Sequence, residues 1–225
     1  IMTVKVAVRN TNVTVEPIIM PAGKTNSTVE VKSDDPREVV EAVVGNLEKL
    51  FTDPAADKVY TKDDKSTVEN GGSVEIKLTL TKTDEKSTSD EITGNFANGD
   101  SLGLRLELEV SKIVTPGGNG DIQVTTVDDT GMLLETTVLL PEALQGKGGY
   151  TVYRLHEGTV QTLTTTPNEH GEYIEISADK ASITIHARLY SEYVIAYQEA
   201  PVQPVQPDQP QPDPAKPERP DSGHI

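Results

Sequence analysis

Apolar residues recur at every second position along much of this chain, and that period limits the fold more than any other feature of its sequence. The two longest examples run from Val74 to Leu80 and from Leu102 to Val110. Successive side chains of a β-strand point to opposite faces, so this period gives each segment one buried and one solvated face. Shorter runs of the same kind lie at residues 4–8, 13–15, 29–31, 174–176 and 183–185. The sequence therefore predicts a mainly β protein.

Short clusters of Gly, Asn, Asp and Pro separate these runs. They lie at residues 70–72, 98–100, 116–120 and 157–158. Glycine and asparagine readily adopt the backbone conformations that tight hairpins need. Because strands and turns alternate at short spacing, we expect antiparallel strands in a β-sandwich rather than a repeated strand-helix-strand fold.

One segment has a helical period instead. Between residues 36 and 51 apolar side chains recur three or four positions apart, with Asp35 at the N-cap position and Pro36 at the first helical position. The apolar set is Val39, Val40, Val43, Leu47, Leu50 and Phe51. We predict one amphipathic helix near residues 36–51, which covers a sheet face or closes one end of the sandwich. A helix that binds a partner is the alternative.

The last 25 residues differ from the rest in composition. Residues 201–225 hold eight of the 15 prolines. Proline has no backbone N–H for sheet or helix bonds, so such a segment is expected to run as extended polyproline II. We predict a Pro-rich linker over 199–225 that acts as a spacer. A ligand for proline-binding grooves is the alternative.

The Gly-rich turn at residues 117–120 suggests a boundary within the β region. It divides the chain into a β-rich subdomain with one helix, 1–115, and a β-sandwich subdomain, 116–198. The alternative is that both parts form one continuous module.

Charge and cysteine content exclude several classes of function. The chain carries 36 Asp and Glu against 20 Lys and Arg, a net charge of -16, and it has no Cys. A surface so acidic repels phosphate backbones, so nucleic acid is not an expected partner. Without Cys there is no disulfide, thiolate metal site or Cys nucleophile. No run approaches the roughly 20 apolar residues of a membrane span, so membrane insertion is not expected.

The alternation begins with the first residues, without the basic and apolar regions of a signal peptide. We therefore expect a piece of a longer polypeptide, whose upstream domains are its first partners.

The sequence does not predict an enzyme. The four histidines are His156, His170, His186 and His224, and neither a Gly-x-Ser-x-Gly elbow nor a His-Glu-x-x-His motif is present. A hydrolase would need His156 or His186 beside carboxylates in a cleft.

Calcium is the one cofactor that the sequence leaves open. Asp128 and Asp129 precede Thr130 and Gly131 in a turn, where adjacent carboxylates can converge on a hard cation. The spacing does not match an EF-hand. The alternative is ordinary turn chemistry, in which these side chains bond the nearby backbone.

Two tyrosines are candidates for a ligand-binding face. Six of the seven tyrosines lie between residues 150 and 197, mostly in strands with apolar residues on both faces, as expected for a core. Tyr60 and Tyr190 are the least constrained, and exposed aromatic faces are the common platform for sugars in β-sandwiches. No Trp is present to strengthen such a platform.

Three stretches carry a resemblance to a known family: Leu134 to Leu144, Tyr153 to Gly158 and Tyr190 to Tyr197. Together they resemble the carboxy-terminal β-module of large surface and secreted proteins of Gram-positive, clostridia-like bacteria. In that family a Pro-acid-x-Leu turn precedes a Tyr-Arg-Val-His-Asp-Gly hairpin and a closing aromatic strand. Val68 to Leu78 is similar to the first strand of the module. The departures, at Leu155, Glu157 and Tyr190, are conservative.

The resemblance implies location and role. Such modules are extracellular, often beside a Pro-rich spacer of the cell wall, and have no established catalytic residues. We therefore expect a non-catalytic structural or adhesion module, a stalk or spacer of a larger bacterial surface protein or adhesin. The alternative is a module that binds carbohydrate or a host surface glycoprotein, accessory to a secreted glycan-active enzyme.

Overall fold

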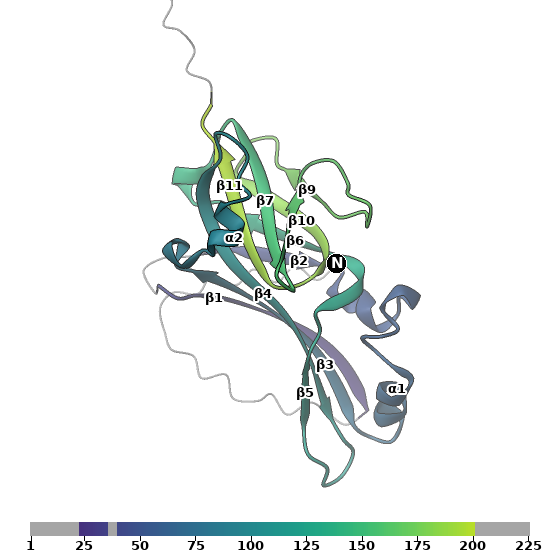
Figure 1. The fold of residues 1–225 in the computed structure, drawn as a ribbon. Coiled ribbons are helices and arrows are strands. Elements are labelled where there is room, and N and C mark those ends of the chain that lie inside the picture. Colours follow the sequence, from purple (N-terminus) through teal and green to yellow (C-terminus); the bar gives the residue numbers. More distant parts are fainter. Residues whose placement is uncertain (1–22, 36–39, 201–225) are drawn as a thin grey trace, which may run out of the picture.

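Segments with the two-residue period form two β-sheets in the computed structural model, which describes residues 23–35 and 40–200 (Figure 1). Sheet A has the strand order β1-β3-β4-β11-β7-β8, and β5 also pairs with β4. Its strands are β1 (Lys24–Ser33), β3 (Ser73–Thr83), β4 (Ser101–Thr115), β5 (Gln123–Thr126), β7 (Gly149–His156), β8 (Thr159–Leu163) and β11 (Glu192–Gln198). Sheet B has the order β2-β6-β10-β9. Its strands are β2 (Ala42–Gly45), β6 (Asp129–Leu139), β10 (Ser182–Leu189) and β9 (Tyr173–Ile176).

The predicted β class is confirmed. All strand pairs in the described residues are antiparallel except β1 with β3, which is parallel. The predicted runs at 4–8 and 13–15 lie outside the described residues.

Alternating apolar residues of the two sheets face each other and form the main core. Leu78 and Leu106 of sheet A and Val138 and Ile183 of sheet B are fully buried. Burial of a side chain of this size stabilises the fold by roughly 1.5–3 kcal/mol. A smaller cluster lies on the outer face of sheet A, where a short helix between β3 and β4 covers Tyr153. Four of the six clustered tyrosines are buried: Tyr150, Tyr153 and Tyr193, as expected, and also Tyr190.

The helices are short. They are α1 (Lys62–Glu69), α2 (Asp90–Thr93) and the 3-10 turns η1 (Leu47–Phe51), η2 (Pro54–Ala56), η3 (Glu85–Ser87) and η4 (Glu142–Leu144). Helix α1 begins at a capping box of Thr61 and Asp64, and Lys112 Nζ of β4 lies 2.8 Å from Asp64 Oδ2. This ion pair fixes α1 beside sheet A. Among the described residues, no helix has the length and hydrophobicity needed to cross a lipid bilayer.

The helix expected near residues 36–51 is not what forms there. Residues 36–39 lie outside the described part, Ala42–Gly45 is strand β2, and only Leu47–Phe51 is helical, as η1. Valine favours strands because its branched side chain is restricted in a helix. Strand β2 also pairs with β6 over Ala42 to Gly45, which buries Ala42 and Val44 on the core side. Pairing across the sheet therefore overrides the helical spacing.

Asn46 ends this strand. Its φ is 54°, its side-chain amide donates to Leu133 O at 3.1 Å, and its side-chain oxygen accepts from Glu135 N–H at 3.2 Å.

Strands from both sides of residue 115 lie in each sheet. Sheet A joins β1, β3 and β4 to β7, β8 and β11, and sheet B joins β2 to β6, β9 and β10. One hydrophobic cluster spans both parts. Both sheets and this cluster therefore run across residue 115 within the described residues, and the division into subdomains stays a prediction. The predicted linker falls largely on residues 201–225, which lie outside the described part.

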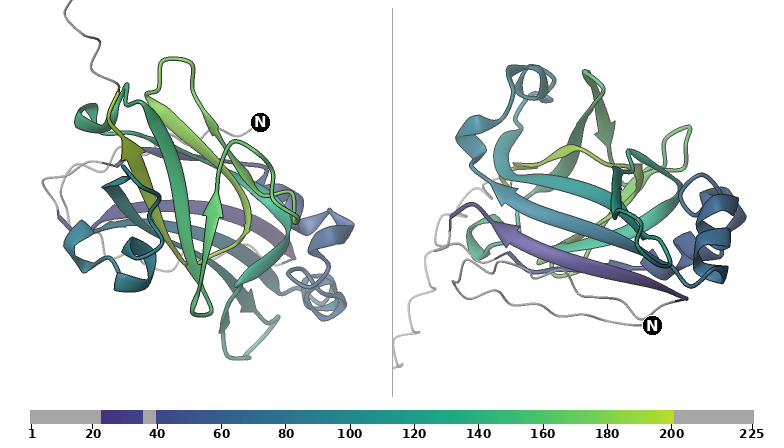
Figure 2. Two further views of the ribbon diagram at one scale, coloured as in Figure 1. Left: turned by 45° about the horizontal axis from the view of Figure 1, so that its top comes forward. Right: turned by 90° about the horizontal axis from the view of Figure 1, so that it is seen from below.

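The described chain enters and leaves sheet A at opposite ends (Figures 1 and 2). At one end Lys24 pairs with Ser73, which in turn pairs with Thr115 at the end of β4. At the other end Tyr197 pairs with Ser101 at the start of β4. Strand β4 has 15 residues. At about 3.4 Å per residue, the two ends are separated by roughly 45–50 Å along the strands.

Candidate functional site: a groove where β4 changes partners

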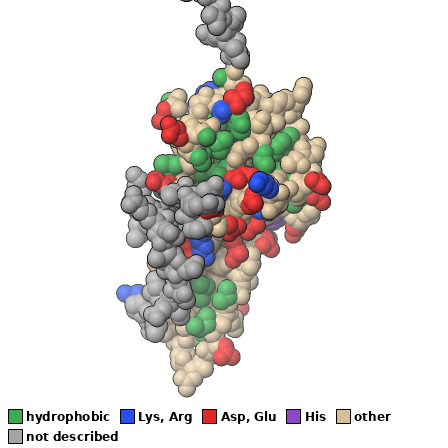
Figure 3. Space-filling model, turned by 90° about the vertical axis from the view of Figure 1, so that its left-hand side faces the viewer, with side chains coloured by type: hydrophobic (Ala, Val, Ile, Leu, Met, Phe, Trp, Pro, Cys, Tyr) green, Lys and Arg blue, Asp and Glu red, His purple; other side chains and the backbone are tan. Residues whose placement is uncertain are grey.

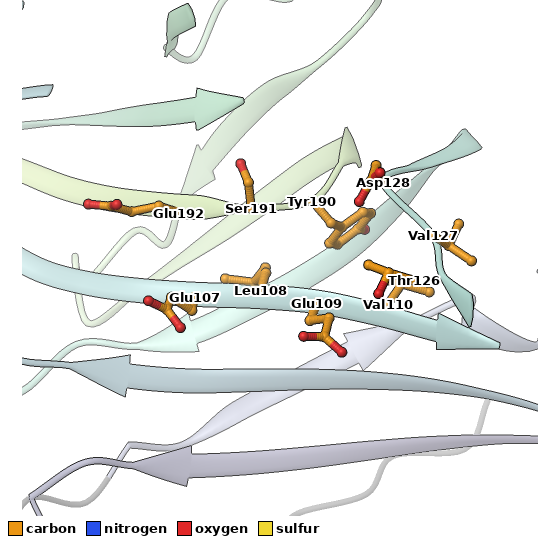
Figure 4. A pocket seen from close by; sticks show the side chains of 10 residues that line it. All are labelled: Glu107, Leu108, Glu109, Val110, Thr126, Val127, Asp128, Tyr190, Ser191 and Glu192. Carbon is orange, nitrogen blue, oxygen red and sulfur yellow. The ribbon is translucent and has the colours of Figure 1, made fainter. Parts of the chain in front are cut away.

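A groove lies along one edge of β4, where the strand paired with that edge changes from β11 to β5 (Figure 4). Strand β11 pairs with β4 up to Glu107, and β5 pairs with it from Ser111 onward. Between them Leu108 N–H donates to Ser191 O at 3.0 Å, and Val127 N–H donates to Val110 O at 2.7 Å. The groove has a volume of about 290 Å³. Its lining is Glu107, Leu108, Glu109, Val110, Thr126, Val127, Asp128, Tyr190, Ser191 and Glu192.

The polar lining of the groove is acidic. Four of its side chains are carboxylates, and Arg105 is the one cation that pairs with them in the described part of the chain. Arg105 Nε donates to Glu192 Oε1 at 2.9 Å, and its Nη2 lies 3.4 Å from Glu107 Oε1. The hydrogen bond to Glu192 raises the pKa of Arg105. Figure 3 shows acidic side chains, with Lys and Arg side chains among them, across the middle of one side of the molecule, between hydrophobic areas.

Two carboxylates of the groove pair with no cation among residues 23–35 and 40–200. Glu109 Oε1 accepts a hydrogen bond from the Ser111 hydroxyl at 2.7 Å. Asp128 accepts from Tyr190 N–H only through its backbone oxygen, at 3.0 Å, and within the described residues its carboxylate has no hydrogen bond or ion pair. These carboxylates are suited to receive a cationic group from outside.

Asp128 and Tyr190, both predicted as site residues, line this same groove. Tyr190, however, is only 4% exposed, and its hydroxyl donates to Ala187 O at 3.2 Å. Burial raises the pKa of this phenol well above its ordinary value. The ring forms part of the core beneath the groove, which corrects the expectation of a free face for stacking on a sugar.

Tyr60 lies elsewhere, between η2 and α1. Its ring meets Phe51 edge to face, with the centroids 5.1 Å apart, and Lys65 Nζ lies 5.6 Å from its centroid. Burial raises its pKa, and the charge of Asp64 adds to this. Tyr60 is half-buried and does not line the groove, so the structure does not bring the two predicted tyrosines together.

Asp129 and Thr130 make the bonds of ordinary turn chemistry, and a calcium site at Asp128 and Asp129 stays a prediction. Asp129 Oδ1 accepts from Gly131 N–H at 2.8 Å, and its Oδ2 lies 3.5 Å from Arg188 Nη2. Thr130 Oγ1 lies 2.7 Å from Met132 O. Asp128 instead lines the groove. Within residues 23–35 and 40–200, no group of three or more His, Asp or Glu gathers as metal ligands.

Gly131 is required by close packing. Its φ is +72°, and a Cβ at this position would lie 2.1 Å from Ala55 O. We expect Gly131→Ala to lower the free energy of unfolding by about 3–4 kcal/mol, because backbone strain and a clash with η2 add. The measurement is urea denaturation with and without calcium. Gly118 (φ +92°) has open space around its Cβ position, so Gly118→Ala is a matched control expected to cost about 1–2 kcal/mol. Equal costs for both variants would contradict the packing account.

The histidines within the described residues do not line the groove. His156 lies at the end of β7, and His170 Nε2 lies 3.6 Å from Glu169 in an exposed loop. His186 stacks on Tyr173 with centroids 4.2 Å apart, and its Nε2 is 3.5 Å from Glu175 Oε2. Since Ile185 faces the core, alternation places His186 on the outer face of sheet B.

The sequence did not reveal the most completely buried charges. Arg154 of β7 and Glu172, just before β9, both have fully buried side chains and form a bidentate pair, with N to O distances of 2.8 and 2.7 Å. Arg188 N–H donates to Glu172 at 3.0 Å, and Arg154 also donates to Tyr193 Oη at 3.2 Å. The only sequence signal was an Arg inside an apolar strand. Its partner could not be chosen among 36 acidic residues.

This pair joins the two sheets through charge. Burial disfavours ionisation of Glu172, but the hydrogen bonds from Arg154 and from Arg188 N–H outweigh it and lower the pKa to about 2. Burial likewise opposes the charge of Arg154, and its bonds to Glu172 still raise its pKa. We call Arg154 and Glu172 the inter-sheet clamp.

No protein-family model, curated protein or solved structure matches this chain.

Proposed function

We propose that this chain is a non-catalytic structural module, a stalk or spacer in a larger bacterial surface protein, which holds upstream domains away from the cell wall. The observation that carries the proposal is where the described part of the chain enters and leaves sheet A. Lys24 lies at one end of the strands of sheet A and Gln198 at the other. Tension between neighbouring domains would therefore run parallel to the strands.

This direction of load suits a force-bearing element. Strand β1 pairs with β3 through ten residues in register. Hydrogen bonds between strands lie across the strand direction, so a pull along the strands strains many of them at once. A pull from one end of a strand pair opens them one after another.

Strand β11, through which the described chain leaves sheet A, and the inter-sheet clamp also support a force-bearing role. Strand β11 lies between β4 and β7 and is hydrogen-bonded on both edges, so it cannot peel away as an edge strand could. The inter-sheet clamp ties β7 to the segment before β9. The sequence resemblance and the Pro-rich composition of 201–225 support an extracellular location beside the cell wall.

The test is single-molecule force spectroscopy of the full chain in two pulling directions. In the first, handles are attached through cysteines at Lys24→Cys and Gln198→Cys, at opposite ends of the strands of sheet A. In the second, they are attached through cysteines at Lys24→Cys and Asn70→Cys, which lie at the same end of β1 and β3. The absence of native Cys makes this labelling specific. We expect the unfolding force along the strands to exceed the force of the second direction by about twofold or more.

Binding of carbohydrate or a host glycoprotein is the second candidate. The groove favours carbohydrate binding, because its carboxylates can accept hydrogen bonds from sugar hydroxyls and its Ser and Thr hydroxyls can both donate and accept them. It ranks second because the one aromatic residue in the lining, Tyr190, is buried. A glycan and mucin array with the wild type and Asp128→Ala separates the two. Glycan signals lost in Asp128→Ala would favour this candidate, whereas the pulling experiment does not depend on the groove.

A further inference from the structure

The hairpin of β4 and β5 extends beyond the body of the sandwich and carries an open edge (Figure 1). In the described residues β5 pairs only with β4, and all four of its residues are exposed. The backbone N–H and C=O groups of its other edge therefore have no strand partner within that part of the chain. The strand contains no Lys and no Pro, the residues that commonly block the edges of sheets.

Two large apolar side chains stand beside this edge. Ile122 is 57% exposed and Val124 is 67% exposed, the highest values among the large hydrophobic residues that the structure describes. Val124 lies within β5, and Ile122 immediately precedes this strand. Val124 is opposite Ile113 of β4, which is half-buried.

The face of β5 that carries Val124 leads into the acidic groove. Thr126 is two positions after Val124 and lines the groove, and it pairs with Ser111, two positions after Glu109. Asp128 follows two positions later. Along β5 the surface thus changes from exposed apolar side chains to carboxylates that pair with no cation in the described part of the chain.

We propose that β5 and the groove receive an extended segment of a partner protein, which adds a strand to the edge of β5 that is unpaired in the described structure. The apolar side chains of the partner segment lie beside Ile122 and Val124, and its Lys or Arg side chains reach Asp128 and Glu109. Main-chain hydrogen bonds supply affinity in this mode of recognition, and alternate side chains supply specificity. The proposal goes beyond the structural role and does not depend on it.

Charge complementarity selects this occupant over two others. A second copy of the chain would bring the same acidic groove and a net charge of -16 to the interface, and like charges repel. The segment 201–225 of this chain has four acidic against two basic residues and eight prolines. Proline cannot donate to a ladder, so that segment is a poor strand. A basic segment without proline is attracted by the acidic groove and can form the backbone hydrogen bonds of a strand.

The test uses a fluorescent peptide in which every second residue is Thr, and the residues between them are two Val followed by two Lys. A second version of the peptide has the reversed sequence. One control peptide has Glu in place of Lys. A second keeps Lys but is N-methylated at alternate residues, which blocks strand pairing. Binding to the full chain is measured by fluorescence anisotropy, and the surface is mapped by amide chemical shifts.

Charge-reversal variants connect binding to the groove. In Glu109→Lys/Asp128→Lys, we expect affinity for the Lys peptide to fall about tenfold or more, because attraction becomes repulsion. Val124→Lys removes the apolar neighbour at a site 67% exposed, so it is expected to weaken binding without unfolding the protein. Glu142→Lys reverses the charge of one exposed carboxylate in η4, outside the groove, and is expected to bind like the wild type.

Binding of the Lys peptide alone, with shifts confined to residues 107–128 and 190–192, would support the proposal. Three results would overturn it: no binding, equal binding of the N-methylated peptide, or affinity unchanged in the double variant. A dimer in sedimentation that Val124→Lys dissociates would assign the edge to a second copy instead and would also overturn it.

Discussion

Replacing Arg154 with Met is expected to lower the free energy of unfolding by about 3–5 kcal/mol, because the Glu172 carboxylate would remain buried without a cation. The side chains of both residues are fully buried, so water cannot replace the lost partner. Glu172→Gln is expected to cost a similar amount, since it leaves the Arg154 guanidinium unpaired. Urea denaturation followed by circular dichroism measures both.

Two further variants show whether the cost comes from an unpaired buried charge. The double variant Arg154→Met/Glu172→Met removes both charges together, and we expect it to be more stable than either single variant. Lys147→Met removes an ion pair with Glu199, whose side chain is 66% exposed, and is expected to change stability very little. If Arg154→Met were as mild as Lys147→Met, the inter-sheet clamp would not hold the sheets together.

Lowering the pH is expected to remove the stabilisation that the inter-sheet clamp provides, without any mutation. The pKa of Glu172 is lowered from its ordinary 4.5 to about 2. A carboxyl group with a lowered folded-state pKa stabilises the protein fully above its unfolded pKa, and this stability is lost as the pH falls through the folded pKa. The loss therefore occurs between about pH 4.5 and about pH 2 and amounts to about 3 kcal/mol.

The measurement is the free energy of unfolding across that pH range for the wild type and Glu172→Gln. Glu30, Asp64 and Asp179 also have lowered pKa values, and they contribute in the same direction in both proteins. The difference between the two curves isolates Glu172 and is expected to shrink as the pH falls. Parallel curves would contradict a lowered pKa for this group.

The β class could be predicted because it depends on local alternation. Runs such as Leu102 to Val110 lie in strands with one face buried, as their period indicated. The helix near residues 36–51 was wrong because a short strand of Ala and Val gains more from pairing with β6 than from helical spacing. That gain comes from a segment about 90 residues later in the chain, which the local pattern does not contain.

The candidate site could be predicted only in part, for the same reason. Asp128 and Tyr190 were chosen for separate ligands, and the topology of sheet A places them in one groove. Glu107 and Glu109 follow the ordinary pattern of solvated strand positions, so no local signal marked them. The inter-sheet clamp joins residues 18 positions apart through space. The bacterial surface location remains a prediction from the resemblance.

The unfolding force in two pulling directions tests the central claim most directly, because that claim concerns how the module carries tension. The account predicts a higher force when Lys24→Cys is pulled from Gln198→Cys than when Lys24→Cys is pulled from Asn70→Cys. The reason is that β1 then shears along β3 over ten paired residues. Equal forces in the two directions, or a weaker module along the strands, would contradict a load-bearing stalk.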